Sequence, residues 1–291
     1  MSPQAASAAR TPFVKLLRGT MIFLAALVVF RFLLEILGTP EASARYVSST
    51  AGLFLVAVYL AAVAPMRGGM QKFRQLLFPA ILLSVWMEAW VILMTLVSAV
   101  LRLSRSHFAE EADYGNWGHL GRHILGHILE IGVFFVVLLV LMAIVHLFWR
   151  WPITVGPGAI LGALVIVRFW VEAMGVETWR ASAWSSTVAI LLCGFFLGGV
   201  GPRAGLGEAR KLLAPALVLG WGWRLWVFIA TLLSALLPFY KTHYFDASQG
   251  DVAGRLLRFL GASVVEGFVA GLIVWGIAVW ISRSIRRPAE T

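Results

Sequence analysis

The chain has 291 residues, of which 60% are hydrophobic and only 13% are charged. A soluble domain carries about 25% charged and about 45–50% apolar residues, so this composition excludes a soluble globular protein and predicts a polytopic membrane protein. The formal net charge of +10 does not indicate nucleic-acid binding, because the basic residues form short clusters between apolar segments. The single cysteine, Cys193, excludes an intrachain disulfide framework and a CxxC metal site.

Eight apolar segments are long enough to cross about 30 Å of hydrocarbon at about 1.5 Å per residue. They are expected at 13–37, 47–66, 74–101, 119–149, 155–175, 183–200, 210–237 and 255–282. Arg and Lys cluster before the first segment and after the second, fourth, sixth and eighth, whereas the opposite loops are mixed or acidic. This distribution predicts a multi-pass protein of the plasma (inner) membrane with both termini cytoplasmic.

The stretch that begins at Arg31 recurs at Arg168, with an offset of 137 residues. The matches are Arg31/Arg168, Phe32/Phe169, Glu35/Glu172, Gly38/Gly175 and Ser48-Ser49-Thr50/Ser185-Ser186-Thr187. After one residue drops out, an offset of 136 aligns Arg74/Arg210, Pro79/Pro215, Trp90/Trp226 and Thr95/Thr231. Chance similarity between apolar helices does not repeat Arg, Glu, Pro and Trp, so the sequence predicts a tandem duplication.

Four helices per repeat is an even number, so both repeats should insert with the same polarity. The predicted fold is therefore an all-α integral membrane protein whose two four-helix repeats are related by a pseudo-two-fold axis along the membrane normal. We place a cytoplasmic tail at 1–12, repeat one at 13–150, repeat two at 151–283 and a second cytoplasmic tail at 284–291. Glycines four residues apart predict close helix packing at Gly158/Gly162, Gly194/Gly198 and Gly267/Gly271.

Ionisable residues inside the predicted helices would each cost about 2.5–3.5 kcal/mol alone at the bilayer centre, so they should face protein or water. Nearly all of them fall in the outer half of the membrane, which predicts a polar crevice open to the outside. The candidate ligand-binding residues are Arg31, Glu35, Arg122, Glu130, Arg168, Glu172, Arg258 and Glu266. Structural pairing is the alternative, because Arg31–Glu35 and Arg168–Glu172 are i,i+4 pairs.

Three histidines and one glutamate form a stripe at the outer end of the fourth helix: His119, His123, His127 and Glu130. On a helix these four side chains fall within about 80° of one another. Such a stripe could bind Zn²⁺ or a similar ion, with Glu35 or Glu88 completing the site from a neighbouring helix. Polar packing and proton or anion handling are the alternatives. No other cofactor is expected, and the aligned residues Arg255, Phe259 and Ser263 restrict any metal site to the first half.

The two longer outer loops also correspond. Arg105-Ser106-His107-Phe108 aligns with Lys241-Thr242-His243-Tyr244 at the offset of 136 residues. We treat His107 and His243 as an outer-loop motif. The alternative is an interfacial turn that places an imidazole and an aromatic ring at headgroup depth.

We expect a transporter, or a solute-binding membrane component, for a small polar or ionic solute in a lipid bilayer. One alternative is a structural subunit whose outer loops dock a partner subunit. Another is a metal-dependent membrane enzyme that uses the histidine stripe. The sequence lacks Walker A, GxSxG and HExxH motifs, which favours a protein that is not an enzyme.

Glu88 in the third predicted helix aligns with Arg224 in the seventh, both near mid-membrane. In a symmetric ancestral dimer a residue on the axis would meet its own copy. Divergence to opposite signs therefore predicts an inter-repeat pair between Glu88 and Arg224.

The pairing can be tested by reversing both charges. Glu88→Arg combined with Arg224→Glu should be tolerated better than either single change, because only the double variant restores an attractive pair. The measurement is the thermal unfolding midpoint of each detergent-purified variant. Additive damage in the double variant would contradict the contact.

Overall fold

The computed structural model of the chain describes residues 3–67, 70–237, 241–246 and 250–286. Every regular element in these ranges is helical, and eight helices are long and apolar enough to cross a membrane. The predicted all-α class is thereby confirmed, and eight helices have the length and apolar composition that the prediction of eight membrane spans requires. The predicted tails fall partly outside the described residues, at 1–2 and at 287–291, which include the basic residue Arg287.

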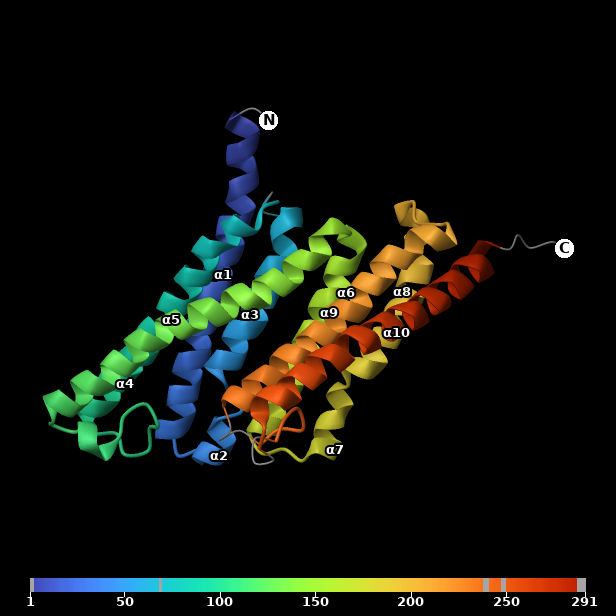
Figure 1. Cartoon of the computed structure of the whole chain (residues 1–291). Helices are drawn as coiled ribbons and strands as arrows, with labels where there is room; N and C mark the ends of the chain where they lie inside the picture. The colour runs from blue at the N-terminus through green and yellow to red at the C-terminus, as the bar shows by residue number, and fades with distance from the viewer. Residues whose placement is uncertain (1–2, 68–69, 238–240, 247–249, 287–291) are drawn as a thin grey trace. The chain divides into compact units, whose positions relative to one another are not determined.

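The chain divides into two compact units, Met1–Ala143 and Ile144–Thr291, which we call unit 1 and unit 2. The division falls inside one helix, seven residues before the predicted boundary at 150. Unit 1 contains α1 (Pro3–Ile36), α2 (Glu41–Ala44), α3 (Ser49–Arg67), η1 (Phe73–Leu76), α4 (Leu77–Leu101), η2 (Glu111–Asp113) and most of α5 (Trp117–Leu147). The four long helices of this unit and its loops are shown in Figure 1.

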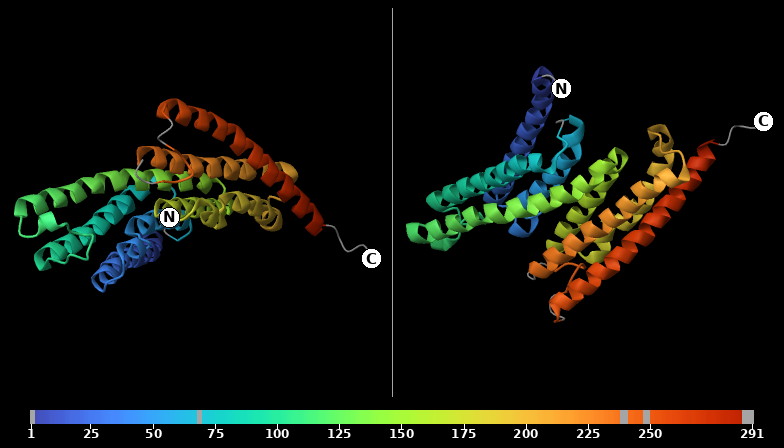
Figure 2. Two further views of the ribbon diagram at one scale, coloured as in Figure 1. Left: turned by 90° about the horizontal axis from the view of Figure 1, so that it is seen from below. Right: turned by 45° about the horizontal axis from the view of Figure 1, so that its top comes forward.

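Unit 2 contains the end of α5, η3 (Phe148–Arg150), α6 (Pro152–Ala173), α7 (Thr178–Ala181), η4 (Ser182–Trp184), α8 (Ser186–Val200), η5 (Gly201–Ala204), α9 (Ala209–Leu236) and α10 (Val252–Arg286). Helix α10 lies along α9, as Figure 2 shows, and it also contacts α8. Helix α6 packs against α9, so α9 has neighbours on two sides.

Glycine ends the first long helix of each unit. Gly38 follows α1 with φ of 95°, and Gly175 follows α6 with φ of 92°. A side chain would be strained in this left-handed conformation, whereas glycine adopts it freely and stops the helix. Each glycine turns the chain into a short loop that carries a four-residue helix, α2 or α7.

Tryptophan side chains join neighbouring helices through hydrogen bonds to backbone carbonyls. In unit 1 the Trp86 indole N–H donates to the Met21 carbonyl at 2.8 Å, which links α4 to α1. In unit 2 Trp226 donates to Gly158 at 3.1 Å and Trp275 donates to Ala209 at 2.7 Å. Trp226 is 1% exposed, so this residue, which the repeat aligned with Trp90, is part of the core of unit 2.

The predicted glycine pairs lie where helices approach closely. A Cβ atom at Gly194 or Gly198 would meet side chains and carbonyls of α10, and one at Gly158 would meet the Phe148 ring. Gly220 of α9 faces the backbone of Gly267 and Gly271 on α10. Small residues therefore let these helix backbones touch, as is common between membrane helices.

Substituting Gly220 tests this packing. In Gly220→Val the side chain would enter the backbone of α10 and force α9 and α10 apart, which should cost about 1–3 kcal/mol of unfolding free energy. Gly276→Val is the matched control, because among the described residues nothing lies within 4 Å of a Cβ at Gly276. Equal unfolding free energies of the two variants in detergent micelles would contradict this account.

Candidate functional site

The Glu35 carboxylate fastens the end of α1 to the loop that follows α4. Glu35 is 1% exposed. The Arg31 Nε donates to its Oε1 at 3.2 Å, while Oε2 lies 3.0 Å from the His107 backbone nitrogen and 2.6 Å from the His107 Nδ1. Arg31 and Glu35 make the i,i+4 contact of the structural alternative, and the loop residue His107 is a further partner of the same carboxylate.

The same contacts occur in unit 2. Glu172 is 2% exposed, and the Arg168 Nε lies 3.2 Å from its Oε1. Its Oε2 lies 2.8 Å from the His243 backbone nitrogen and 2.6 Å from the His243 Nδ1. We call each arrangement a loop clamp: Arg31, Glu35 and His107 in unit 1, and Arg168, Glu172 and His243 in unit 2.

A second layer of matching contacts supports each loop clamp. Hydroxyl pairs join the end of the preceding helix to the loop, Ser98 to Ser106 at 2.8 Å and Ser234 to Thr242 at 2.6 Å. The residue after each histidine packs its ring against the first long helix of its unit, Phe108 on Phe32 at 6.0 Å and Tyr244 on Phe169 at 6.3 Å between ring centroids. Burial raises the pKa of the Tyr244 phenol, so this ring stays neutral.

Both oxygens of each clamp carboxylate are therefore engaged by protein donors. Four of the predicted ligand-binding residues are therefore paired within their own units. Arg31 contacts Glu35, and Arg168 contacts Glu172. Buried charges that are paired and hydrogen-bonded hold elements in register, and removal of one partner is costly. This geometry favours a structural role for the loop clamps, with His107 and His243 as carboxylate partners.

A different carboxylate, Asp113, gathers two histidines of α5. Asp113 ends η2 and is 1% exposed. Its Oδ1 lies 2.7 Å from the His119 Nδ1, its Oδ2 lies 2.8 Å from the His123 Nδ1, and the Glu110 backbone N–H donates to Oδ2 at 2.9 Å. Burial alone would raise the pKa of Asp113, but these hydrogen bonds outweigh it and lower the pKa to about 2.

From His123 the contacts continue along α5 towards the middle of α4. The rings of His123 and His127 stack with 5.1 Å between centroids. The His127 Nδ1 lies 3.2 Å from the Glu88 Oε2 and 3.0 Å from the Glu130 Oε2. We call this line, Asp113, His123, His127 and Glu88, the histidine row.

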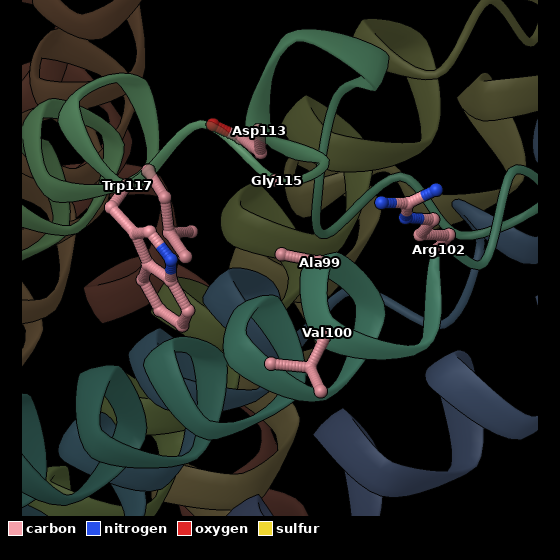
Figure 3. Close-up of a pocket in the computed structure, with 7 residues that line it drawn as sticks. Ala99, Val100, Arg102, Asp113, Gly115 and Trp117 are labelled. Carbon is pink, nitrogen blue, oxygen red and sulfur yellow. The ribbon is translucent and has the colours of Figure 1, made fainter.

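The loop end of the histidine row borders a pocket of about 150 Å³. Figure 3 shows Asp113 and Trp117 on one side of this pocket and Arg102 on another, with Ala99 of α4 between them. The remaining lining residues are Val100, Gly115 and Leu120. The pocket thus brings an acidic and a basic side chain together beside the start of α5.

The structure divides the predicted histidine stripe between two carboxylate centres. His119 and His123 bind Asp113, whereas His127 joins Glu88 and Glu130. Glu88 therefore reaches the stripe, as the sequence suggested, while Glu35 belongs to a loop clamp. The sequence spacing on the helix does not identify Asp113 as a site residue. The one signal is its position six residues before His119, which lies in the first turn of α5.

The other predicted residues lie in simpler surroundings. Arg122 is exposed, and the Arg258 Nη2 lies 3.5 Å from the Asp251 Oδ2 at an exposed position. The Arg224 Nη2 lies 2.7 Å from the Glu266 Oε2. Glu88 and Arg224 thus each have a partner within their own unit, and their mutual pairing stays a prediction for the charge-reversal experiment.

Comparisons with protein-family models, with curated proteins and with solved structures find no match for this chain.

The Asp113 centre predicts an acid-sensitive contribution to stability. Its pKa is about 2 in the folded chain against a reference value of 3.8, so its stabilisation is present above pH 3.8 and is lost as the pH falls through 2. Asp113→Asn should lower the unfolding free energy by about 2 kcal/mol near neutral pH, and the difference from wild type should shrink between pH 4 and 2.

The measurement is denaturant unfolding of both proteins in detergent micelles over this pH range. Glu111→Gln, at an exposed carboxylate of the same short helix, is the control and should show no such pH-dependent difference. A difference for Asp113→Asn that stayed constant down to pH 2 would contradict the assignment.

Proposed function

We propose that the protein is a multi-pass transporter, or the solute-binding component of one, for a small ionic solute that carries positive charge. The observation that supports this most is the histidine row. It begins at an extramembrane loop, beside a pocket, and reaches Glu88, twelve residues into the 25-residue helix α4.

Ionisable groups inside membrane helices are costly, and in many membrane proteins they mark an ion or proton pathway. Carboxylates stand at both ends of the histidine row, Asp113 and Glu88, and the imidazoles of His123 and His127 lie between them. Negative ends and titratable centres suit a cation better than an anion. Glu130, whose side chain is 52% exposed, lies beside His127 at the inner end of the row.

We also propose that the protein arose by duplication and that both of its termini are cytoplasmic. The matching contacts of the two loop clamps support a tandem duplication of a four-helix unit. An even number of helices per copy gives both copies the same polarity, so we propose that a pseudo-two-fold axis along the membrane normal relates them. The basic clusters support cytoplasmic termini in the plasma (inner) membrane, which would place the loop clamps and the Asp113 pocket on the outer side. Ions would then enter the histidine row from outside.

A second candidate function is that of a structural subunit whose outer loops dock a partner subunit. The observation that favours it is the full engagement of Glu35 and Glu172, because clamped loops present a fixed surface. The two functions differ in whether the isolated protein moves an ion.

The test is ion flux in liposomes that contain the purified protein. Protons are followed with an entrapped pH dye, and Zn²⁺ and Mn²⁺ with entrapped metal dyes. Wild type should pass at least one of these ions, and Glu88→Gln should slow that flux about tenfold or more, because a loss of about 1.4 kcal/mol of interaction with the ion already gives a factor of ten.

Glu177→Gln, at an exposed position of unit 2, is the control and should leave the flux at the wild-type rate. Wild-type flux no faster than in protein-free liposomes would overturn the transport proposal and leave the structural subunit. Equal flux in wild type and Glu88→Gln would show that ions do not use the histidine row.

A further inference from the structure

Three side chains from two helices of unit 1 converge at the inner end of the histidine row. Glu88 comes from α4, and His127 and Glu130 lie one turn apart on α5. Their ligand atoms all lie within 4.8 Å of one another. The His127 Nδ1 lies 3.2 Å from one carboxylate and 3.0 Å from the other. Zinc–ligand bonds of about 2.0–2.1 Å in tetrahedral geometry place neighbouring ligand atoms about 3.3 Å apart, so the spacing already approximates an edge of a coordination polyhedron.

The Glu88 carboxylate lacks a full set of partners. Glu88 is 1% exposed, and among the described residues its Oε2 has no hydrogen bond of acceptable geometry. Within the three-residue set, two carboxylates face one imidazole, so when both carboxylates are ionised a negative charge remains even if His127 is protonated. A buried charge without compensation is unfavourable, particularly within a membrane. A divalent cation bound to two carboxylates and a neutral imidazole leaves no net charge.

Unit 2 shows how the same positions are neutralised by the protein itself. The residues 136 positions further along the chain are Arg224, Ser263 and Glu266. The Arg224 guanidinium lies 2.7 Å from the Glu266 carboxylate and donates to the Ser263 hydroxyl at 3.3 Å. Unit 2 therefore supplies its own cation. Unit 1 has a carboxylate in place of that guanidinium and an imidazole in place of the hydroxyl, two changes that remove a positive charge and add two metal ligands.

We propose that Glu88, His127 and Glu130 bind a divalent transition-metal ion, with Zn²⁺ as the reference member of the class. One nitrogen and two oxygen ligands suit Zn²⁺, Mn²⁺ or Fe²⁺, whereas Mg²⁺ and Ca²⁺ prefer oxygen ligands alone. Three protein ligands leave a fourth position open for water or for exchange, beside the half-exposed Glu130. That a transported ion occupies this site on its path rests on the proposed function, whereas the binding of a metal ion to the site does not.

The ligand set differs from the helix stripe that the sequence suggested. The Nδ1 atoms of His119 and His123 are directed at Asp113, which holds both rings. If Glu88, His127 and Glu130 bind the metal, Glu88→Gln should weaken binding and His119→Ala should not. If the helix stripe binds it, His119→Ala should weaken binding.

The test is a titration of the full-length, chelator-treated protein in detergent with Zn²⁺ by calorimetry. Co²⁺ absorption reports the coordination geometry. Wild type should bind one ion per chain, and Glu88→Gln and His127→Ala should each weaken binding by about 100-fold or more, since loss of even an outer-shell partner costs 10–100-fold. Glu266→Gln is the matched control, because this carboxylate lies at the corresponding helix position and is paired with Arg224; it should bind like wild type.

A gain-of-site variant guards against simple misfolding of the loss variants. Arg224→Glu combined with Ser263→His recreates the unit 1 triad around Glu266, and the stoichiometry should rise from one to two ions per chain. A folded double variant that still binds one ion would contradict the comparison between the units.

Three outcomes would overturn the proposal: no binding of Zn²⁺ by wild type, binding unchanged in Glu88→Gln, or loss of binding in His119→Ala. The proposal and the transport function fail separately. Zinc binding without flux leaves the site and removes the transporter, whereas Glu88-dependent proton flux without zinc binding leaves the transporter and removes the metal site.

Discussion

A carboxylate placed inside a membrane helix has to find a positive charge or several hydrogen-bond donors, because the surrounding hydrocarbon offers neither. Glu35 and Glu172 meet this requirement by drawing a histidine and its backbone N–H from a loop more than seventy residues further along the chain. The carboxylate thereby holds the loop against the end of the first long helix, which a glycine of positive φ follows in each unit. In each unit, one buried carboxylate therefore fixes the position of the loop that carries its histidine partner.

Four carboxylates are buried among the residues that the structure describes, and they differ in how many of their oxygens have hydrogen-bond donors. Those of Glu35 and Glu172 have donors on both oxygens, and Asp113 receives two imidazoles and a backbone N–H. Glu88 depends on His127, which it shares with Glu130. A fully satisfied centre resists change, because any movement leaves a charge exposed to the low-dielectric interior. An incompletely satisfied centre is where a proton, an ion or a conformational change can be accommodated, and this contrast points away from the loop clamps and towards Glu88.

Sequence spacing predicts the interactions between residues that are close together in the chain. The helical class, the eight spans and the Arg31–Glu35 and Arg168–Glu172 contacts follow from apolar length and from i,i+4 spacing, which a helix fixes. The histidine partners of these carboxylates could not be derived in the same way, since the position of His107 depends on how an irregular loop folds back over α1. For the stripe on α5, spacing placed the rings on one face but could not choose between Asp113 and Glu88 as their partners. That choice depends on where the short helix η2 and the neighbouring helix α4 lie. The periodicity of α5 does not contain this information.

The indole hydrogen bonds between helices have a practical consequence. Trp86, Trp226 and Trp275 each donate to a backbone carbonyl of another helix. Such a bond breaks as soon as the two helices slide or separate, and the emission of an indole responds to loss of its hydrogen-bond partner and to entry of water. The protein therefore carries intrinsic fluorophores at its helix contacts, and single-tryptophan variants would report movement within each unit without an added label.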